Sequence, residues 1–295
     1  MSDASLRDRD AVVRRLWADS AEAYADLALQ LPTYQISNRR LVEAVGLRAG
    51  DRVVDLACGG GATLAAAFDV EPRIAAAWAV DWVDGMIAEA RRRLAGRPVT
   101  FVVASAQAFA DRVGAEPVDC VLSNGAFFHF ERPELVLAEV GRVLKADGVL
   151  GFTVPAPSNG GAFFDLFRRA GLIGPAPAAG APRLGPGPGL GPRLGPGARS
   201  RRIGADNVER LLGECGWRIE TLERIVAPTS HEDYIRWMTL PVFRHPDWAG
   251  LPQDDLAARL RDTLRGTDLQ PEVGWVIVVA RRAATEPIST DAARR

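Results

Sequence analysis

The residues with the clearest chemical potential are glycines and carboxylates at the ends of apolar runs. In the segment VVDLACGGGATL, Asp55 ends such a run and a glycine-rich turn, Cys58 to Gly61, follows directly. Glycines lack Cβ atoms, so a ligand can closely approach the backbone amides and the N-terminus of the next helix. The turn therefore predicts a site for a nucleotide-like molecule without deciding which one.

A second carboxylate, Asp81, ends the next apolar run, AAAWAVD. At the end of a neighbouring parallel strand, an acidic side chain can accept hydrogen bonds from both hydroxyls of a ribose. The dinucleotide pattern G-x-G-x-x-G/A fits less well, because Leu64 stands where a third small residue is needed for close packing of helix and strand. A ribose-containing cofactor other than NAD is favoured.

Five segments, in order, resemble the motifs of class I S-adenosylmethionine-dependent methyltransferases, and most closely the small-molecule branch that includes the quinone-biosynthesis methyltransferases. These segments are VVDLACGGG, AVDWVDGMIAEA, VVASAQAFA, VDCVLSNGAFFHF and LAEVGRVLKADGVL. The resemblance implies S-adenosylmethionine as cofactor and transfer of its methyl group, by in-line displacement, to an O-, C- or N-acceptor on a small apolar or aromatic molecule. The alternative is a protein that binds the cofactor on this scaffold without methyl transfer, such as a cyclase.

The resemblance also assigns cofactor contacts. Asp55, Ala57, Gly59 and Gly61 would surround the methionine end of the cofactor, and Asp81 would hold the ribose hydroxyls.

At the adenine, Trp82 and Met86 would flank the ring, with Ser105, Ala106 and Gln107 near its amino group. Ser105 stands where the family usually has an acidic residue, and an uncharged hydroxyl is a weaker acceptor than a carboxylate. This departure predicts weaker cofactor binding.

The methyl group and its acceptor are expected to meet at Asn124, after the fourth apolar run. His129 lies close by in sequence and is the candidate catalytic base, needed only if the acceptor must lose a proton; packing or capping is the alternative. Tyr24 either covers the cofactor from the N-terminal helices or packs on the core. A substrate pocket is expected from side chains that could equally form a core, namely Phe128, Phe163, Phe167, Tyr234, Trp237 and Met238.

Short apolar runs separated by helical stretches must position these residues. Runs that are apolar on both faces suit parallel strands covered by helices. The predicted fold is an α/β protein with a doubly wound, mostly parallel, seven-stranded, Rossmann-like sheet, N-terminal helices and a lid or substrate insertion after the fifth strand.

The chain divides into five expected parts. Residues 1–47 form N-terminal helices and residues 48–155 the cofactor-binding core. Residues 156–204 form an insertion rich in glycine and proline, whose arginines suit either a solvated loop or a clamp for an anionic group. Residues 205–283 complete the core and add a helical aromatic segment, and residues 284–295 are a loose tail.

Bulk composition narrows the function further. The 295 residues are 47% hydrophobic and 25% charged, which is typical of a globular protein, and the formal net charge is -1. No global field would attract nucleic acid or an acidic membrane, and no apolar segment is long enough to cross a bilayer. The three cysteines and three histidines show no metal-ligand spacing. We expect a cytoplasmic enzyme without a metal, a nucleic-acid partner or a membrane partner, and its oligomeric state is left open.

Overall fold

The computed structural model describes residues 3–156, 160–175 and 203–283. Most of the expected glycine- and proline-rich insertion, and the whole of the expected tail 284–295, lie outside the described residues.

Seven strands form one sheet, in the order β3-β2-β1-β4-β5-β7-β6. Neighbouring strands from β3 to β5 are parallel, whereas β7 runs antiparallel to both β5 and β6. The predicted seven-stranded, mostly parallel Rossmann-like sheet is therefore confirmed. The strands are β1 Arg52–Leu56, β2 Ala76–Asp81, β3 Val99–Val103, β4 Val118–Ser123, β5 Leu144–Pro155, β6 Trp217–Pro228 and β7 Glu272–Arg282.

After Arg52, strand β1 is apolar at every position but one, because both faces of the sheet are covered. Val54 and Leu56 point into one buried cluster with α6 and α8, whereas Val53 points into another that includes α2, α3 and α4. Side chains alternate along a strand, so a strand covered on both sides needs apolar residues at every position except where chemistry requires otherwise. Asp55 is that exception in β1.

Two helices precede the sheet, α1 Asp3–Gln30 and α2 Pro32–Val45. Pro32 occupies the first turn of α2, where its missing N–H costs nothing, and Gly46 ends that helix with a left-handed φ of 67°. Helix α2 packs tightly on the sheet, since a Cβ at Gly151 of β5 would lie 2.3 Å from Val45 Cγ1. The predicted N-terminal helices are thereby confirmed.

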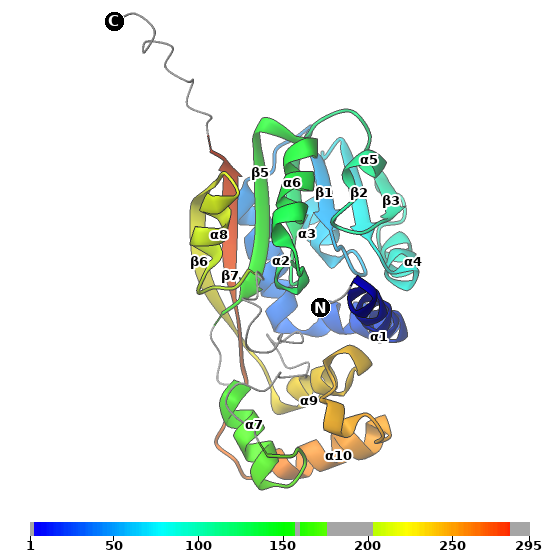
Figure 1. Cartoon of the computed structure of the whole chain (residues 1–295), viewed down its shortest axis with the longest axis vertical. Coiled ribbons are helices and arrows are strands. Elements are labelled where there is room, and N and C mark those ends of the chain that lie inside the picture. The colour runs from blue at the N-terminus through cyan, green and yellow to red at the C-terminus, as the bar shows by residue number, and fades with distance from the viewer. Residues whose placement is uncertain (1–2, 157–159, 176–202, 284–295) are drawn as a thin grey trace, which may run out of the picture.

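The remaining helices cover the sheet or gather beyond its edge. Figure 1 shows α7, α9 and α10 together below the sheet, with the long strands β6 and β7 reaching toward them. No helix of the described ranges combines the length and apolar character needed to cross a bilayer. The helices after α2 are α3 Ala62–Val70, α4 Asp84–Arg93, α5 Ala110–Val113, α6 Pro133–Val143, α7 Gly160–Arg169, α8 Val208–Glu214, α9 His231–Thr239 and α10 Gln253–Leu264. Short 3-10 turns are η1 Phe127–His129, η2 Pro241–Phe243 and η3 Pro246–Trp248.

Candidate functional site

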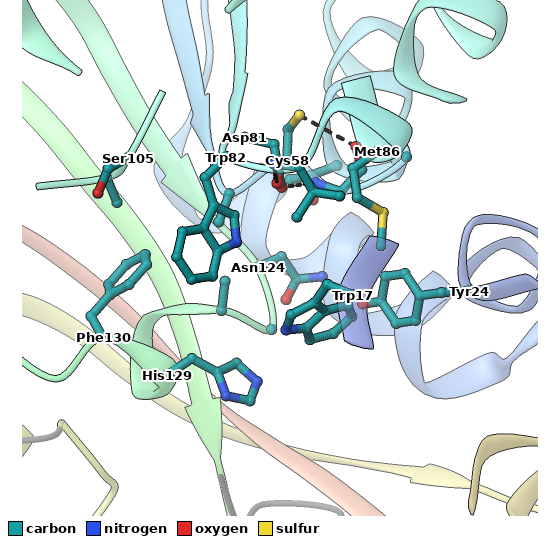
Figure 2. Close-up of a pocket in the computed structure, with 18 of the residues that line it drawn as sticks. Trp17, Tyr24, Cys58, Asp81, Trp82, Met86, Ser105, Asn124, His129 and Phe130 are labelled. Atoms are coloured by element: carbon teal, nitrogen blue, oxygen red, sulfur yellow. Dashed lines mark hydrogen bonds between the residues drawn. The ribbon is translucent and has the colours of Figure 1, made fainter. Parts of the chain in front are cut away.

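A cavity of about 400 Å³ lies where β1, β2 and β4 end. The strand order reverses between β1 and β4, and such reversal points are where open α/β sheets bind ligands. The cavity is roofed by α1, so it is bounded by the sheet edge on one side and by a helix on the other (Figure 2).

The glycine-rich turn forms one wall of this cavity. Gly59 and Gly61 have φ values of 51° and 79°, and Ala57 is the one non-glycine residue of the described chain with a positive φ, at 55°. A Cβ at Gly60 would lie 2.7 Å from Ala25 Cβ of α1, closer than two non-bonded carbon atoms approach each other. The turn therefore adopts its shape, and touches α1, only because its side chains are absent.

Asp81 is the buried carboxylate of the cavity lining. It is 6% exposed, and its Oδ2 accepts a hydrogen bond from the Gly59 N–H while its Oδ1 accepts one from the Val83 N–H, both at 3.0 Å. Burial raises its pKa to about 6, and the backbone hydrogen bonds oppose that rise. Each oxygen keeps a lone pair for a further donor, which suits a pair of ligand hydroxyls.

Asp55 lies behind the turn and does not line the cavity, and Gly61 is likewise outside its lining. The carboxyl of Asp55 is 0% exposed, and neither oxygen has a hydrogen-bond partner among the described residues. Burial and the nearby charge of Asp81 raise its pKa to about 8. Asp55 is thus an uncharged acid at neutral pH, placed beneath the turn and not within it.

The predicted adenine contacts all line the cavity. They come from the start of α4 and from the segment after β3, on the two sides of the strand end that carries Asp81. In Figure 2 the Trp82 ring projects into the space between Ser105 and Trp17. The Ser105 hydroxyl accepts a hydrogen bond from the Gln107 N–H at 3.3 Å. The predicted residues brought together here are Trp82, Met86, Ser105, Ala106 and Gln107.

Helix α1 supplies an aromatic roof. Tyr24 lies over the turn, with its Cε1 3.5 Å from where a Cβ of Gly59 would be, and Trp17 meets the Tyr24 ring edge-on at 5.1 Å between centroids. Burial raises the pKa of the Tyr24 phenol to about 12, so it stays protonated. Trp17 was not predicted; its signal is helical spacing with Val13, Tyr24 and Ala28, which line the same cavity.

Asn124 and His129 both line the cavity and follow β4 in the sequence. His129 belongs to η1, and its ring lies 6.0 Å from Trp17 between centroids. Asn38 and Thr63, which sequence analysis did not single out, also line the cavity and are hydrogen-bonded to each other. They come from α2 and α3, two helices joined only by tertiary packing.

The expected substrate pocket is not part of this cavity. Phe163, Phe167, Tyr234, Trp237 and Met238 form a buried cluster between α7, α9, α10 and the N-terminal helices, and Phe128 packs against it, half-buried. None of these six residues lines the cavity. Aromatic side chains at helical spacing serve a core as readily as a pocket, and here they hold the three helices together.

Cys58 and Cys120 are buried free thiols and Cys215 is half-buried. Within the described ranges no three His, Cys, Asp or Glu residues are grouped so that they could hold a metal ion.

Residues 54–152 match the model of a family described as a methyltransferase domain. No curated protein matches the sequence. The chain is similar in structure to the 1,6-didemethyltoxoflavin-N1-methyltransferase of Burkholderia thailandensis, solved with its substrate and S-adenosylhomocysteine; the TM-score is 0.53 at 16% identity, over 94% of this chain and 90% of that one. It is also similar to YjhP from E. coli, with a TM-score of 0.55 at 16% identity, over 90% and 99% of the two chains.

A third similar structure is the [4+2]-cyclase SpnF, with a TM-score of 0.55 at 18% identity, over 92% of this chain and 95% of that one. At these identities, the likenesses to solved structures establish the fold that the chain shares with them.

Proposed function

Because residues 54–152 match the model of a methyltransferase domain, we propose that the chain uses S-adenosylmethionine to methylate a small aromatic molecule bound beneath α1. The observation that carries the proposal is that one cavity joins the glycine turn and Asp81 to the aromatic roof of Trp17 and Tyr24. A cofactor site and an acceptor site thus share a wall.

The residues present fit the cofactor. Each Asp81 oxygen can accept a hydrogen bond from one ribose hydroxyl. The turn from Ala57 to Gly60 lets a ligand approach its backbone closely. Trp82 and Met86 supply apolar surfaces for an adenine ring. Asp55 would act from beneath the turn, as an uncharged support for its shape.

When bound, S-adenosylmethionine supplies a methyl group on a positively charged sulfur. The chain's own contribution is alignment, since an in-line displacement is accelerated mainly by holding the reacting atoms in place. The roof of Trp17 and Tyr24 excludes water and offers ring faces, which attract a cation as well as an aromatic acceptor.

The acceptor is limited by the size and lining of the cavity. The cavity volume of about 400 Å³ lies near the lower end of sites for small ligands, roughly 300–1,000 Å³, and has to hold the cofactor as well as the acceptor. Beyond the cofactor residues, the lining includes four aromatic side chains: Trp17, Tyr34, His129 and Phe130. We propose a compact, planar acceptor, with His129 taking its proton if the reacting atom carries one.

The deciding experiment is calorimetric titration of the full chain with S-adenosylhomocysteine and, in parallel, with NADH, followed by incubation with S-adenosylmethionine and a panel of small phenols, heteroaromatic amines and quinols. We expect binding of S-adenosylhomocysteine alone and its formation from S-adenosylmethionine with one class of acceptor. Binding without turnover of any acceptor would favour the cyclase-like alternative. Absence of binding would overturn the proposed function.

A further inference from the structure

A chain of hydrogen bonds joins the residues at the end of β4 to β5 and α2, and in each bond the donor and the acceptor can be named. It begins at the Gly125 N–H, which can only donate and is bonded to Thr153 Oγ1 at 2.8 Å. The Thr153 hydroxyl, in turn, donates to Asn124 Oδ1 at 2.7 Å. The Thr153 hydroxyl thus accepts from Gly125 and gives its own proton to Asn124 Oδ1, so the amide nitrogen of Asn124 points away from Thr153.

The direction carries on into α2. Asn124 Nδ2 donates to Ser37 Oγ at 3.0 Å and to Asn38 Oδ1 at 2.6 Å. The Ser37 hydroxyl donates its own proton to the Tyr34 carbonyl at 3.2 Å, so its oxygen can accept the hydrogen bond from Asn124. Thr63 Oγ1 also donates to Asn38 Oδ1, at 2.8 Å. The Asn38 oxygen therefore accepts two hydrogen bonds, which saturates its lone pairs.

The amide nitrogen of Asn38 is what remains. Its two N–H groups have no acceptor among the described residues, although the side chain is 6% exposed and lines the cavity. A donor without a protein partner gains a hydrogen bond when a ligand brings an acceptor into the cavity. The oxygen of this side chain is held by two hydrogen bonds, and its amide nitrogen is left to an acceptor on a ligand in the cavity that Asn38 lines.

We propose that Asn38 is a ligand-positioning residue that donates to a carboxylate, phenolic or carbonyl oxygen of a molecule bound in the cavity. The inference rests on the proposed function for the identity of that molecule. Two sources share this chemistry, the carboxylate of the cofactor's methionine part and an oxygen on the methyl acceptor. Thr63 in the first turn of α3 and Asn124 at the end of β4 flank Asn38, so it faces the junction between the two halves of the cavity.

The test is the isosteric substitution Asn38→Asp, which keeps an oxygen for Thr63 and Asn124 and replaces only the donor by a second oxygen. Two ligands are titrated by calorimetry, S-adenosylhomocysteine and its analogue in which hydrogen replaces the carboxylate. Steady-state kinetics with the accepted substrate follow. Asn207→Asp, at the start of α8, makes the same chemical change away from the cavity and is the matched control.

If the oxygen is the cofactor's, we expect Asn38→Asp to weaken S-adenosylhomocysteine by tenfold or more while the analogue binds as it does to the wild type. If the oxygen is the acceptor's, both nucleosides bind unchanged and the KM of the acceptor rises by tenfold or more, with a smaller change in kcat. Wild-type values for both ligands and for KM would overturn the inference.

Folding of each variant is checked by thermal unfolding. Should Asn38→Asp not fold, Asn38→Ser carries the same test, because its shorter side chain keeps an oxygen but no longer offers the two amide donors. Failure of the wild type to bind S-adenosylhomocysteine would instead overturn the proposed function, and this inference with it.

Discussion

At the scale of single residues, Asp81 is the side chain on which the proposed cofactor site depends most. Its two oxygens already orient the turn and the start of α4 through the Gly59 and Val83 amides. The same oxygens are the ones proposed to accept from the ribose hydroxyls. Loss of one acceptor would therefore disturb both the turn and the ligand.

We expect Asp81→Asn to weaken S-adenosylhomocysteine by at least about tenfold, because an amide nitrogen would meet an N–H where an oxygen accepted one before. Calorimetry measures this affinity. Asp84→Asn, three residues on and exposed beside Arg14, is the matched control and should bind normally. Equal affinities for the two variants would remove Asp81 from the site.

His129 tests whether the reaction needs a base. For an acceptor that must lose a proton, we expect His129→Gln to slow turnover by roughly 10²–10⁴-fold, which is the usual range for general-base catalysis, and to leave S-adenosylhomocysteine binding unchanged. The pH dependence of kcat should lose its histidine limb. The matched control is His245→Gln, at the start of the 3-10 turn η3, which should keep the wild-type turnover rate and its pH dependence. A wild-type profile for His129→Gln would reduce His129 to packing.

At the scale of elements, the contact between α1 and the glycine turn positions both halves of the cavity. Gly60 touches Ala25 directly, and Arg93 at the end of α4 donates both to the Gly60 carbonyl and, at 2.9 Å, to the Ala25 carbonyl. The guanidinium thereby joins α4, the turn and α1 in one place. Partial burial lowers the pKa of the Arg93 guanidinium.

Substitution of Gly60 by alanine tests this contact. The new methyl group would push α1 away from the turn, and overpacking of this kind costs typically 1–3 kcal/mol. We expect Gly60→Ala to lower the melting temperature and to weaken S-adenosylhomocysteine. Gly213→Ala, in α8 where nothing lies within 4 Å of the new methyl, should leave binding unchanged and stabilise the helix slightly. A Gly60→Ala variant as stable as wild type would show that α1 docks loosely.

The strands and the glycine turn could be predicted from the sequence, whereas part of the cavity lining could not. Strands β1 to β5 and the turn at Gly59 were predictable, because a strand buried on both faces and a glycine-rich turn are local signals. Trp17 and Asn38 were not, since each reaches the cavity only through the docking of α1 or α2 onto the sheet. The residues Phe163 and Trp237 were expected in a pocket because aromatic composition does not reveal which side of a helix a neighbour covers.

At the scale of the whole molecule, two buried acids link stability to pH. The pKa values of Asp55, about 8, and Asp81, about 6, lie above the 3.8 of an unfolded aspartate, so the folded chain holds more protons than the unfolded chain between these limits. Stability then falls as pH rises, because ionisation favours the unfolded state.

We expect the free energy of unfolding to decrease between about pH 4 and pH 8 through these two groups, with little further change from them above pH 8. Asp55→Asn should remove the larger part of this dependence and be more stable than wild type at pH 8. Denaturant unfolding at a series of pH values gives the slope. A wild-type stability that rises through this window while the Asn variant follows in parallel would contradict the assignment.

The roof formed by α1 bears on the order of events in a catalytic cycle. Trp17 and Tyr24 lie about two helical turns apart and line the same cavity, so one helix would cover both proposed ligands. A displacement that frees one of them loosens the other, and departure of both products becomes one kinetic event. Once chemistry outpaces that displacement, the turnover rate should fall in proportion to solvent viscosity, as it does for any motion that has to push solvent aside.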